Sequence, residues 1–323
     1  MKKFASLLLA ALMFCSMAAC GTSEDAASSA PAASQAPAAQ TASAAPETQA
    51  PTETPAASVT EEASVQEETP VLDAAEIQVF IAASLGNAFQ DIVALYNQSQ
   101  PNVTITLNAD SSGTLLTQIE EGFSCDIFFS AATKQMDALE KDGLVVEGTR
   151  VDLLKNQLAL ITYKDSGTAV TGLENLSEAS SMALADGSVP AGKYTRKALQ
   201  GLGILDASLE PADITSQEVS DALGGLTINE TSNVSKTLEA VAEGSNEAGT
   251  VYYSDAYSRI NDIEIIEMVP SDLTGSIVYP MCRVQNAEAG DPETAAADNF
   301  FAFLQTPAVM EIFETYMFLN NAG

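Results

Sequence analysis

Short apolar runs alternate with amphipathic segments from Glu76 to the end of the chain. Compact apolar runs predict buried strands, whereas apolar residues that recur at every third or fourth position predict helices. Strands are predicted at IQVFIAA, VTITLN, DIFFSA, LALITY, SMALAD, GTVYYS and SIVYPMCRV. Helices are predicted over 85–96, from 115, through 136–139, and over 193–202, 233–241, 295–304 and 308–317. Strands alternating with helices predict an α/β fold with parallel sheets that helices cover on both faces.

Two of the predicted strands lead into helices that begin near a serine, Ser84 in FIAASLG and Ser112 in DSSGTL. Ligands of open α/β sheets bind beyond the carboxyl ends of the strands, where helices begin. A helix N-terminus offers unpaired N–H groups that bind an anion without Lys or Arg, and a serine adds a hydroxyl donor. Simple N-capping is the alternative for each serine. We expect no carboxylate at either helix start, because Asn87 and Leu115 stand where a capping box has Glu or Gln.

The N-terminal part of the chain has a different composition. Lys2 and Lys3 precede the apolar run FASLLLAALMF, and small residues lead to Cys20. Residues 1–20 therefore resemble a bacterial lipoprotein signal in which Cys20 is lipidated, and the alternative is an ordinary signal peptide cut nearby. Residues 21–75 are rich in Ala, Pro, Ser, Thr and Glu, without an aromatic or basic residue, which predicts a disordered tether.

Composition restricts the chemistry of any site in the folded part. The 323 residues include 13 Lys and Arg against 44 Asp and Glu, which gives a net charge of −31, and they include no His. So acidic a chain is not expected to bind nucleic acid through a general phosphate field. The absence of His excludes Ser-His-Asp and Cys-His catalysis and His-ligated metal. A Ser-x-x-Lys pair and a Gly-rich phosphate loop are absent as well.

Two further groups of residues leave alternatives open. Cys125 and Cys282 lie in apolar, strand-like runs, which favours two buried thiols, although an exported compartment also permits a disulfide. Lys193, Arg196 and Lys197 form a basic cluster. A solvated helix face is the favoured interpretation of this cluster, and assistance to a bound anion is the other.

Five motifs together resemble the molybdate-binding proteins of bacterial molybdate ABC transporters. They are FIAASLGNAFQDI, SSGTLLTQIEEG, CDIFFSA, SVPAGKYTRKAL and GTVYYSDA, in this order, and the resemblance runs from about Ile77 to the C-terminus. It implies a two-lobed type II periplasmic-binding-protein fold with the ligand cleft between the lobes. It further implies that residues 76–153 and 284–323 form lobe 1 and residues 154–283 form lobe 2.

The resemblance also implies a set of site residues that bind an oxyanion through neutral donors. Ser84 and Ser112 match hydroxyl donors of the first lobe, and Tyr252 matches a hydroxyl donor of the second. Ala191 and Val234 match backbone N–H donors at helix starts of the second lobe. The implied ligands are molybdate and also tungstate, with no cofactor and no metal cation. The implied partner is the permease of an ABC importer, and the implied form is a monomer anchored to the outer face of the cell membrane.

Physical chemistry agrees with this donor set and leaves other functions to be weighed. Neutral donors disfavour protonated oxyanions such as hydrogen phosphate, because a ligand O–H finds no acceptor. The molybdate assignment itself rests on the resemblance. One alternative is a protein of the same fold that binds sulfate or another small anion. The others are an exported enzyme with Ser84 as nucleophile, which lacks a His base, and a surface protein that has kept the fold without transport.

Overall fold

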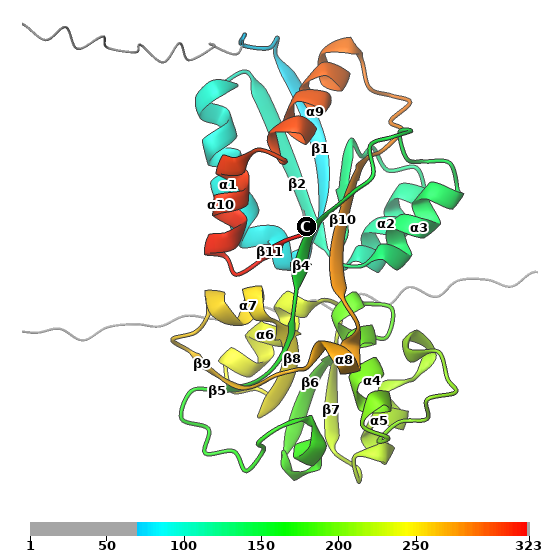
Figure 1. Ribbon diagram of the computed structural model, residues 1–323, viewed down its shortest axis with the longest axis vertical. Coiled ribbons are helices and arrows are strands. Elements are labelled where there is room, and N and C mark those ends of the chain that lie inside the picture. The colour runs from blue at the N-terminus through cyan, green and yellow to red at the C-terminus, as the bar shows by residue number, and fades with distance from the viewer. Residues whose placement is uncertain (1–69, 322–323) are drawn as a thin grey trace, which may run out of the picture. The chain divides into compact units, whose positions relative to one another are not determined.

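The computed structural model describes residues 70–321 (Figure 1). The expected signal at residues 1–20, Cys20 and the expected tether as far as residue 69 lie outside the described residues. Strand β1 begins at Ala75, and the segment before it is held by Gln100, whose side chain accepts from the Leu72 N–H at 2.9 Å. None of the helices within residues 70–321 has the length and apolar character needed to cross a bilayer.

The first sheet has six strands in the order β11-β4-β10-β3-β1-β2. Strand β1 (Ala75–Ala82) is parallel to β2 (Val103–Asp110) and β3 (Ile127–Phe129). Strand β10 (Ile277–Arg283) is antiparallel to β3 and to β4 (Val151–Asn156), and β11 (Leu319–Asn320) is antiparallel to β4.

The second sheet has five strands in the order β7-β6-β8-β5-β9. Strand β6 (Ser181–Ala185) is parallel to β7 (Thr227–Thr231) and β8 (Ala248–Tyr252). Strand β5 (Leu158–Tyr163) is antiparallel to β8 and β9 (Ile263–Met268). The prediction of parallel sheets is thus wrong in part, because the strands that carry the chain between the sheets run against their neighbours.

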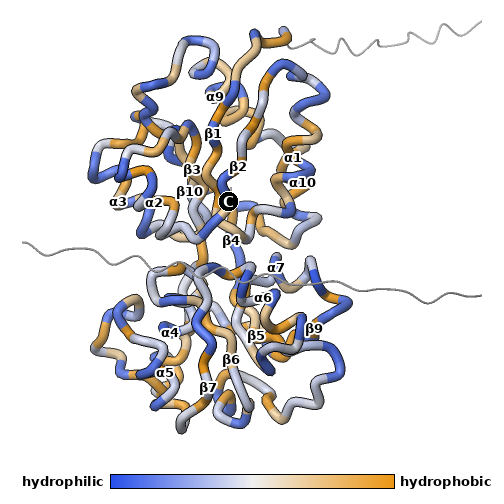
Figure 2. The backbone as a smooth tube through the Cα atoms, turned by 180° about the vertical axis from the view of Figure 1, so that it is seen from behind, coloured by the Kyte–Doolittle hydropathy of each residue, from blue (hydrophilic) through white to orange (hydrophobic). Residues whose placement is uncertain are grey.

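Helices cover both faces of the first sheet, as the alternation of elements predicted. Helices α1 (Gly86–Ser99), α9 (Asp291–Phe303) and α10 (Pro307–Thr315) lie on one side, and α2 (Ser112–Glu120) and α3 (Thr133–Lys141) on the other (Figure 1). Because side chains alternate along a strand, Val79 and Ile81 pack with the first group while Phe80 packs with the second. The strands accordingly form the hydrophobic interior in Figure 2.

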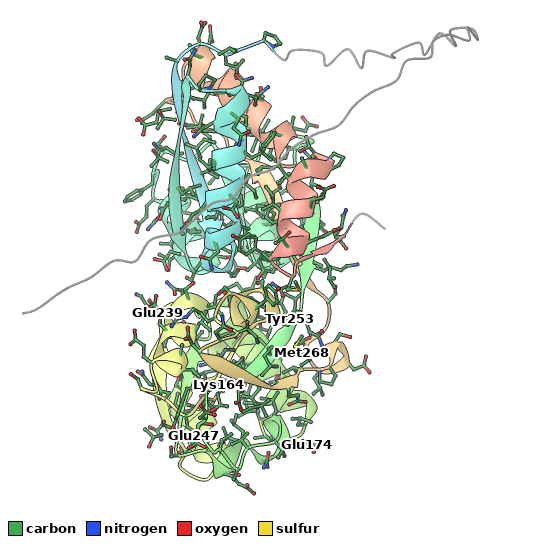
Figure 3. The ribbon with its side chains drawn as sticks, turned by 90° about the vertical axis from the view of Figure 1, so that its left-hand side faces the viewer. Lys164, Glu174, Glu239, Glu247, Tyr253 and Met268 are labelled. Atoms are coloured by element: carbon green, nitrogen blue, oxygen red, sulfur yellow. The ribbon has the colours of Figure 1, made fainter. Side chains whose placement is uncertain are left out.

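Five helices and three short 3-10 turns complete the described chain. The helices are α4 (Pro190–Gly201), α5 (Ser216–Ala222), α6 (Val234–Ala242), α7 (Tyr253–Ser258) and α8 (Ser271–Thr274). The turns are η1 (Ala83–Leu85), η2 (Leu173–Glu178) and η3 (Pro211–Asp213). Glu247, which precedes β8, ties loops of the second sheet together by accepting from Thr168 Oγ1 at 2.5 Å and the Ser180 N–H at 2.8 Å (Figure 3).

Two strands join the two lobes. Strand β4 passes into β5 with only Gln157 between them, and β10 returns the chain to the first sheet (Figure 1). Strands β4 and β10 pair with each other, and their register shifts between Tyr279 and Pro280, which has no N–H to donate. The expected lobe boundary at residue 153 falls inside β4 and that at 283 falls at the end of β10, so the division of the chain into these segments stays a prediction.

Both cysteines of the folded part are free thiols. Cys125 and Cys282 are buried in the hydrophobic cluster under α2 and α3, together with Phe80 and Met136. Burial raises the pKa of the Cys282 thiol to about 12. The structure therefore has the two buried thiols that were favoured over a disulfide.

Candidate functional site

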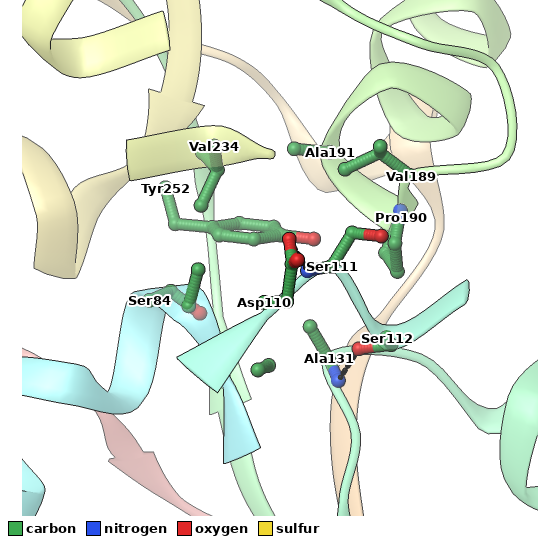
Figure 4. Close-up of a pocket in the computed structure, with 12 residues that line it drawn as sticks. Ser84, Asp110, Ser111, Ser112, Ala131, Val189, Pro190, Ala191, Val234 and Tyr252 are labelled. Atoms are coloured by element: carbon green, nitrogen blue, oxygen red, sulfur yellow. Dashed lines mark hydrogen bonds between the residues drawn. The ribbon is translucent and has the colours of Figure 1, made fainter. Parts of the chain in front are cut away.

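A small cavity lies between the two lobes, where β1 and β2 end and α2, α4 and α6 begin (Figure 4). Its lining residues are Ala82, Ala83, Ser84, Asp110, Ser111, Ser112, Ala131, Val189, Pro190, Ala191, Val234 and Tyr252. The space open to the centre of a water molecule is about 10 Å³. The enclosed part of the cavity thus suits a compact group of a few heavy atoms.

The structure brings all five residues predicted for the site into the lining of this one cavity. Ser84 and Ser112 reach it from the first lobe, and Ala191, Val234 and Tyr252 reach it from the second (Figure 4). Each of the five is buried. The fold therefore brings residues that are as much as 168 positions apart in the sequence, Ser84 and Tyr252, into one cavity.

Ser84 does not cap a helix. It lies in η1, and the N-cap of the following helix α1 is Leu85. Its hydroxyl shares a 2.9 Å hydrogen bond with the hydroxyl of Tyr279, which also accepts from Asn156 Nδ2 at 3.3 Å. Tyr279 lies in β10 and Asn156 in β4, so Ser84 is linked through Tyr279 to the paired strands that join the lobes.

Ser112 does not cap its helix either. The N-cap of α2 is Ser111, whose Oγ accepts from the Thr114 N–H at 3.1 Å. The Oγ of Ser112 accepts from the Ala131 N–H at 2.9 Å, as the dashed line in Figure 4 marks. This contact leaves the proton of the Ser112 hydroxyl to be donated, since the Ala131 N–H occupies only an acceptor lobe of the oxygen.

Ala191 and Val234 place two helix N-termini at the cavity. Ala191 is the second residue of α4, after Pro190, and Val234 is the first residue of α6. The N–H groups of a first turn have no carbonyl four residues earlier, and they form the positive end of the helix dipole. The side-chain oxygen of Asn233 takes the Lys236 N–H at 3.0 Å. The Val234 N–H is not bonded to that cap.

Tyr252 supplies a hydroxyl without a partner. The side chain is 1 % exposed, and its hydroxyl makes no hydrogen bond within the described structure. The hydroxyl points to the middle of the cavity, towards the first lobe (Figure 4). Burial raises its pKa well above the ordinary value, so it stays protonated and can donate. A buried polar group left unpaired costs about 1–3 kcal/mol, which a ligand acceptor would recover.

Sequence reasoning missed one charged residue of the lining, although the first turns of η1, α1 and α2 contain no acidic residue, as expected. Asp110, the last residue of β2, lines the cavity. Its Oδ1 accepts from the Ser111 N–H at 2.7 Å and from Asn233 Nδ2 at 3.0 Å. The signal was present in the motif DSSGTL, where an acidic residue stands directly before the two serines.

The basic cluster of α4 divides: Lys193 is partly exposed and Lys197 is exposed, as a solvated helix face predicts, whereas Arg196 is buried. Arg196 is completely buried, so it is not on a solvated face, and neither Arg196 nor any other Lys or Arg belongs to the cavity lining. Its guanidinium donates to the carbonyls of Ile214 at 2.7 Å and Ala185 at 2.8 Å. It therefore ties α4 to the second sheet. Residues 70–321 also contain no cluster of His, Cys, Asp and Glu that would hold a metal ion.

Asp255 is a buried carboxyl close to the cavity. It lies in the first turn of α7, three residues after Tyr252, and its Oδ2 has no hydrogen-bond partner within residues 70–321. Burial raises its pKa to about 7, although the backbone N–H groups of Tyr252 and of Asp255 itself act against this shift. Its charge therefore changes near neutral pH beside the helix start that carries Tyr252.

Two α/β lobes joined by paired strands, with a small donor-lined cavity between them, define a type II periplasmic binding protein. The chain belongs to the family of bacterial extracellular solute-binding proteins, whose profile matches residues 77–319. The predicted fold class is confirmed, and so is the resemblance to the molybdate-binding family. A family of binding proteins does not support the enzyme alternative built on Ser84.

Three comparisons describe the similarity. The molybdate-binding protein ModA of Escherichia coli is 32% identical over 256 residues, which cover 76% of this chain and 90% of that protein. Bacillus subtilis YvgL, named as an ABC transporter substrate-binding lipoprotein, is 30% identical over 243 residues, which cover 75% of this chain and 85% of YvgL. The periplasmic molybdate-binding protein of Azotobacter vinelandii has the same fold, with a TM-score of 0.60 and 18% identity over 75% of this chain and 98% of that one.

Proposed function

We propose that this protein captures molybdate, and also tungstate, outside the cytoplasm and delivers it to the permease of an ABC importer. The ligand would be held by the hydroxyls of Ser84, Ser112 and Tyr252 and by the N–H groups of Ala191 and Val234. The similarity to the ModA proteins supports the ligand, and the ABC transporter assignment of YvgL supports the partner.

The observation that carries the proposal is the hydroxyl of Tyr252, which has no partner within residues 70–321 and points into a small cavity that two helix N-termini also line. A hydrogen bond from a neutral donor to a charged oxygen contributes about 1.5–3 kcal/mol, more than a bond between neutral groups. Several such donors stabilise an oxyanion without the desolvation cost of a buried Lys or Arg. A compact tetrahedral anion fits both the size of the cavity and its donors.

Asp110 changes the argument about phosphate. Its carboxylate provides an acceptor at the cavity, so a protonated oxyanion no longer faces donors alone. Hydrogen phosphate therefore belongs among the ligands to be tested, together with sulfate.

The anchoring of the protein belongs to the same proposal. We propose that Cys20 carries a lipid that holds a monomeric binding domain at the outer face of the cell membrane. The order of basic, apolar and small residues before Cys20 supports a lipoprotein signal, and YvgL is named as a lipoprotein. A Cys20→Ala variant should then leave the membrane fraction, whereas a variant that stays in that fraction would refute the anchor.

Calorimetric titration tests the ligand. The purified protein is titrated with molybdate, tungstate, sulfate and phosphate, alongside Ser112→Ala and the control Ser99→Ala. Ser99 lies at the far end of α1, and its hydroxyl donates to the Tyr96 carbonyl at 3.0 Å. We expect tight binding of molybdate and tungstate, with binding weakened in Ser112→Ala and unchanged in Ser99→Ala. Binding of sulfate or phosphate alone would replace the proposed ligand, and silence towards all four in folded protein would refute an oxyanion function.

A further inference from the structure

Asp110 joins the two lobes at the edge of the cavity. It ends β2 in the first lobe, and its Oδ1 accepts from Asn233 Nδ2 of the second lobe at 3.0 Å. Asn233 is 8 % exposed and Asp110 is half-buried, so this contact is partly shielded from water. A hydrogen bond between lobes exists only while the lobes are together, which makes the contact specific to the closed arrangement.

The same carboxylate oxygen holds the starts of two helices that face the cavity. It accepts from the N–H of Ser111, which is the N-cap of α2, and Ser111 is followed by Ser112. It accepts from the side chain of Asn233, which is the N-cap of α6, and Asn233 is followed by Val234. One oxygen atom thus fixes the positions of two proposed ligand donors from opposite lobes.

The charge of Asp110 works against an anionic ligand. Asp110 takes part in none of the ion pairs among residues 70–321, and the cavity lining contains no cation. Like charges a few ångströms apart in a cavity shielded from water repel each other. A neutral acceptor in the same place would make the same hydrogen bonds without this repulsion, so the contact and the charge have separable effects.

We propose that Asp110 and Asn233 form a latch that holds the cleft closed and positions the donors of α2 and α6, while the charge of Asp110 limits the affinity for a dianion. The inference rests on the proposed function, because it concerns release of the ligand from that same cavity. Asp110 is a positioning residue, and the latch sets how long the bound anion is retained.

Two substitutions of Asp110 separate the contact from the charge. Asp110→Asn keeps an oxygen that accepts from Ser111 and Asn233, whereas Asp110→Ala removes it, and both remove the charge. We expect Asp110→Ala to release molybdate about tenfold faster than Asp110→Asn, because only Asp110→Ala loses the hydrogen bond between the lobes. A factor of ten corresponds to about 1.4 kcal/mol. Asp110→Asn should bind molybdate more tightly than the wild-type protein. Equal release from the two variants would overturn the latch, and unchanged affinity in Asp110→Asn would overturn the role of the charge.

Asn233→Ser supplies the other half of a double-mutant cycle. Serine preserves the N-cap of α6 but is too short to reach Asp110. We expect Asn233→Ser to speed release in the wild-type background and to add little to Asp110→Ala, because the two changes remove one interaction. Additive effects of the two substitutions would contradict a direct contact.

Small-angle scattering of the ligand-free proteins separates failure of the latch from failure of the proposed function. Without any anion, Asp110→Ala and Asn233→Ser should have a larger radius of gyration than Asp110→Asn and the wild-type protein. If no oxyanion binds the wild-type protein, the proposed function fails, and scattering alone then decides the latch. If the proposed function has failed, an equal radius of gyration in all four proteins would overturn the latch as well.

Discussion

At the scale of single residues, two adjacent tyrosines have different environments. Tyr252 ends β8 with its hydroxyl in the cavity, whereas Tyr253 begins α7 and its backbone N–H donates to the Gln157 carbonyl at 2.8 Å. Tyr253 lies at the level where the lobes meet, outside the cavity lining (Figure 3). Because side chains alternate along the chain, neighbouring tyrosines cannot both reach the ligand.

Tyr252→Phe should weaken molybdate binding about ten- to a hundredfold, because a donor to a charged oxygen is removed. The thermal midpoint of the ligand-free protein should stay the same or rise, since the hydroxyl has no partner to lose within the described structure. Titration calorimetry and thermal unfolding measure the two effects. Tyr253→Phe is the matched control and should bind as the wild-type protein does; weakening by Tyr253→Phe instead would assign the donor to the wrong tyrosine.

Asp255 gives a pH dependence of stability with a definite sign. Its pKa is about 7 in the folded protein and about 4 in an unfolded chain, so the folded state binds the proton more tightly. The contribution of Asp255 to stability is therefore complete below about pH 4 and is lost as the pH rises through 7. The loss is at most about 1.4 kcal/mol per pH unit in that interval.

Asp255→Asn removes this titration while keeping the shape of the side chain. The thermal midpoint of the variant minus that of the wild-type protein should be more positive at about pH 8 than at about pH 5. Other groups titrate in both proteins and cancel in the difference. A difference independent of pH would mean that Asp255 does not titrate in this range.

The sequence predicted some residues of the site and not others, for physical reasons. Ser84 and Ser112 follow the neighbouring strands β1 and β2, so local sequence is enough to place them at one edge of the first sheet, whereas Tyr252 of the second sheet was predicted from the family resemblance. The hydrogen bond of Asp110 to Asn233 joins residues 123 positions apart, and such pairing depends on how the lobes meet. The error at Arg196 has a similar origin, since the burial of that helix face depends on the carbonyls of β6 and of the loop before α5.

At the scale of elements, α4 approaches β6 more closely than any side chain would allow. A Cβ at Gly192 would lie 2.2 Å from the carbonyl oxygens of Ala185 and Asp186. These are backbone atoms at the end of β6 and cannot move aside without displacing the strand. The absence of a side chain at Gly192 thus fixes the N-terminus of α4, and with it the Ala191 N–H.

Gly192→Ala should displace the start of α4, lower the thermal midpoint and weaken molybdate binding by at least about tenfold. Gly86→Ala is the control, because Gly86 begins α1 with a helical φ of −54° and no atom within 4 Å of an added Cβ. That variant should be neutral or slightly more stable. If Gly192→Ala and Gly86→Ala had the same thermal midpoint and the same molybdate affinity, the close approach of α4 to β6 would be contradicted.

The elements that the sequence pattern missed are short or exposed. Strand β7 has mostly exposed side chains at the edge of its sheet, so it contains no apolar run to reveal it. The predicted strand GTVYYS stops at Tyr252, and helix α7 takes over at Tyr253. The apolar pattern does not distinguish strand from helix there, because a short apolar run is compatible with both.

At the scale of the whole molecule, an anion-binding protein carries a large charge of the same sign as its ligand. The net charge of the chain is −31, and no Lys or Arg lines the cavity to offset it locally. Long-range repulsion is screened within about 8 Å at physiological ionic strength. Capture therefore depends on short-range hydrogen bonds, and the field of the protein does not accelerate the encounter.

The association rate of molybdate should accordingly stay constant or rise as salt increases. Stopped-flow measurement of tyrosine fluorescence would follow it, since the chain has 8 Tyr and no Trp. Sodium gluconate in place of sodium chloride controls for competition by chloride. A rate that falls steeply with added salt would show attraction between protein and ligand and contradict this prediction.

The position of β10 has a consequence for the order in which the chain folds. All five strands of the second sheet lie in one continuous stretch, from Leu158 to Met268. In the first sheet, β3 and β4 do not pair with each other, and β10, which lies between them, is made more than a hundred residues later. A chain that folds as it emerges can complete the second sheet while the first is still in two unconnected pieces. The face that α9 and α10 cover stays open still longer, until residue 315 has been added, so the first sheet is the part of the protein that is exposed to aggregation for the longest interval.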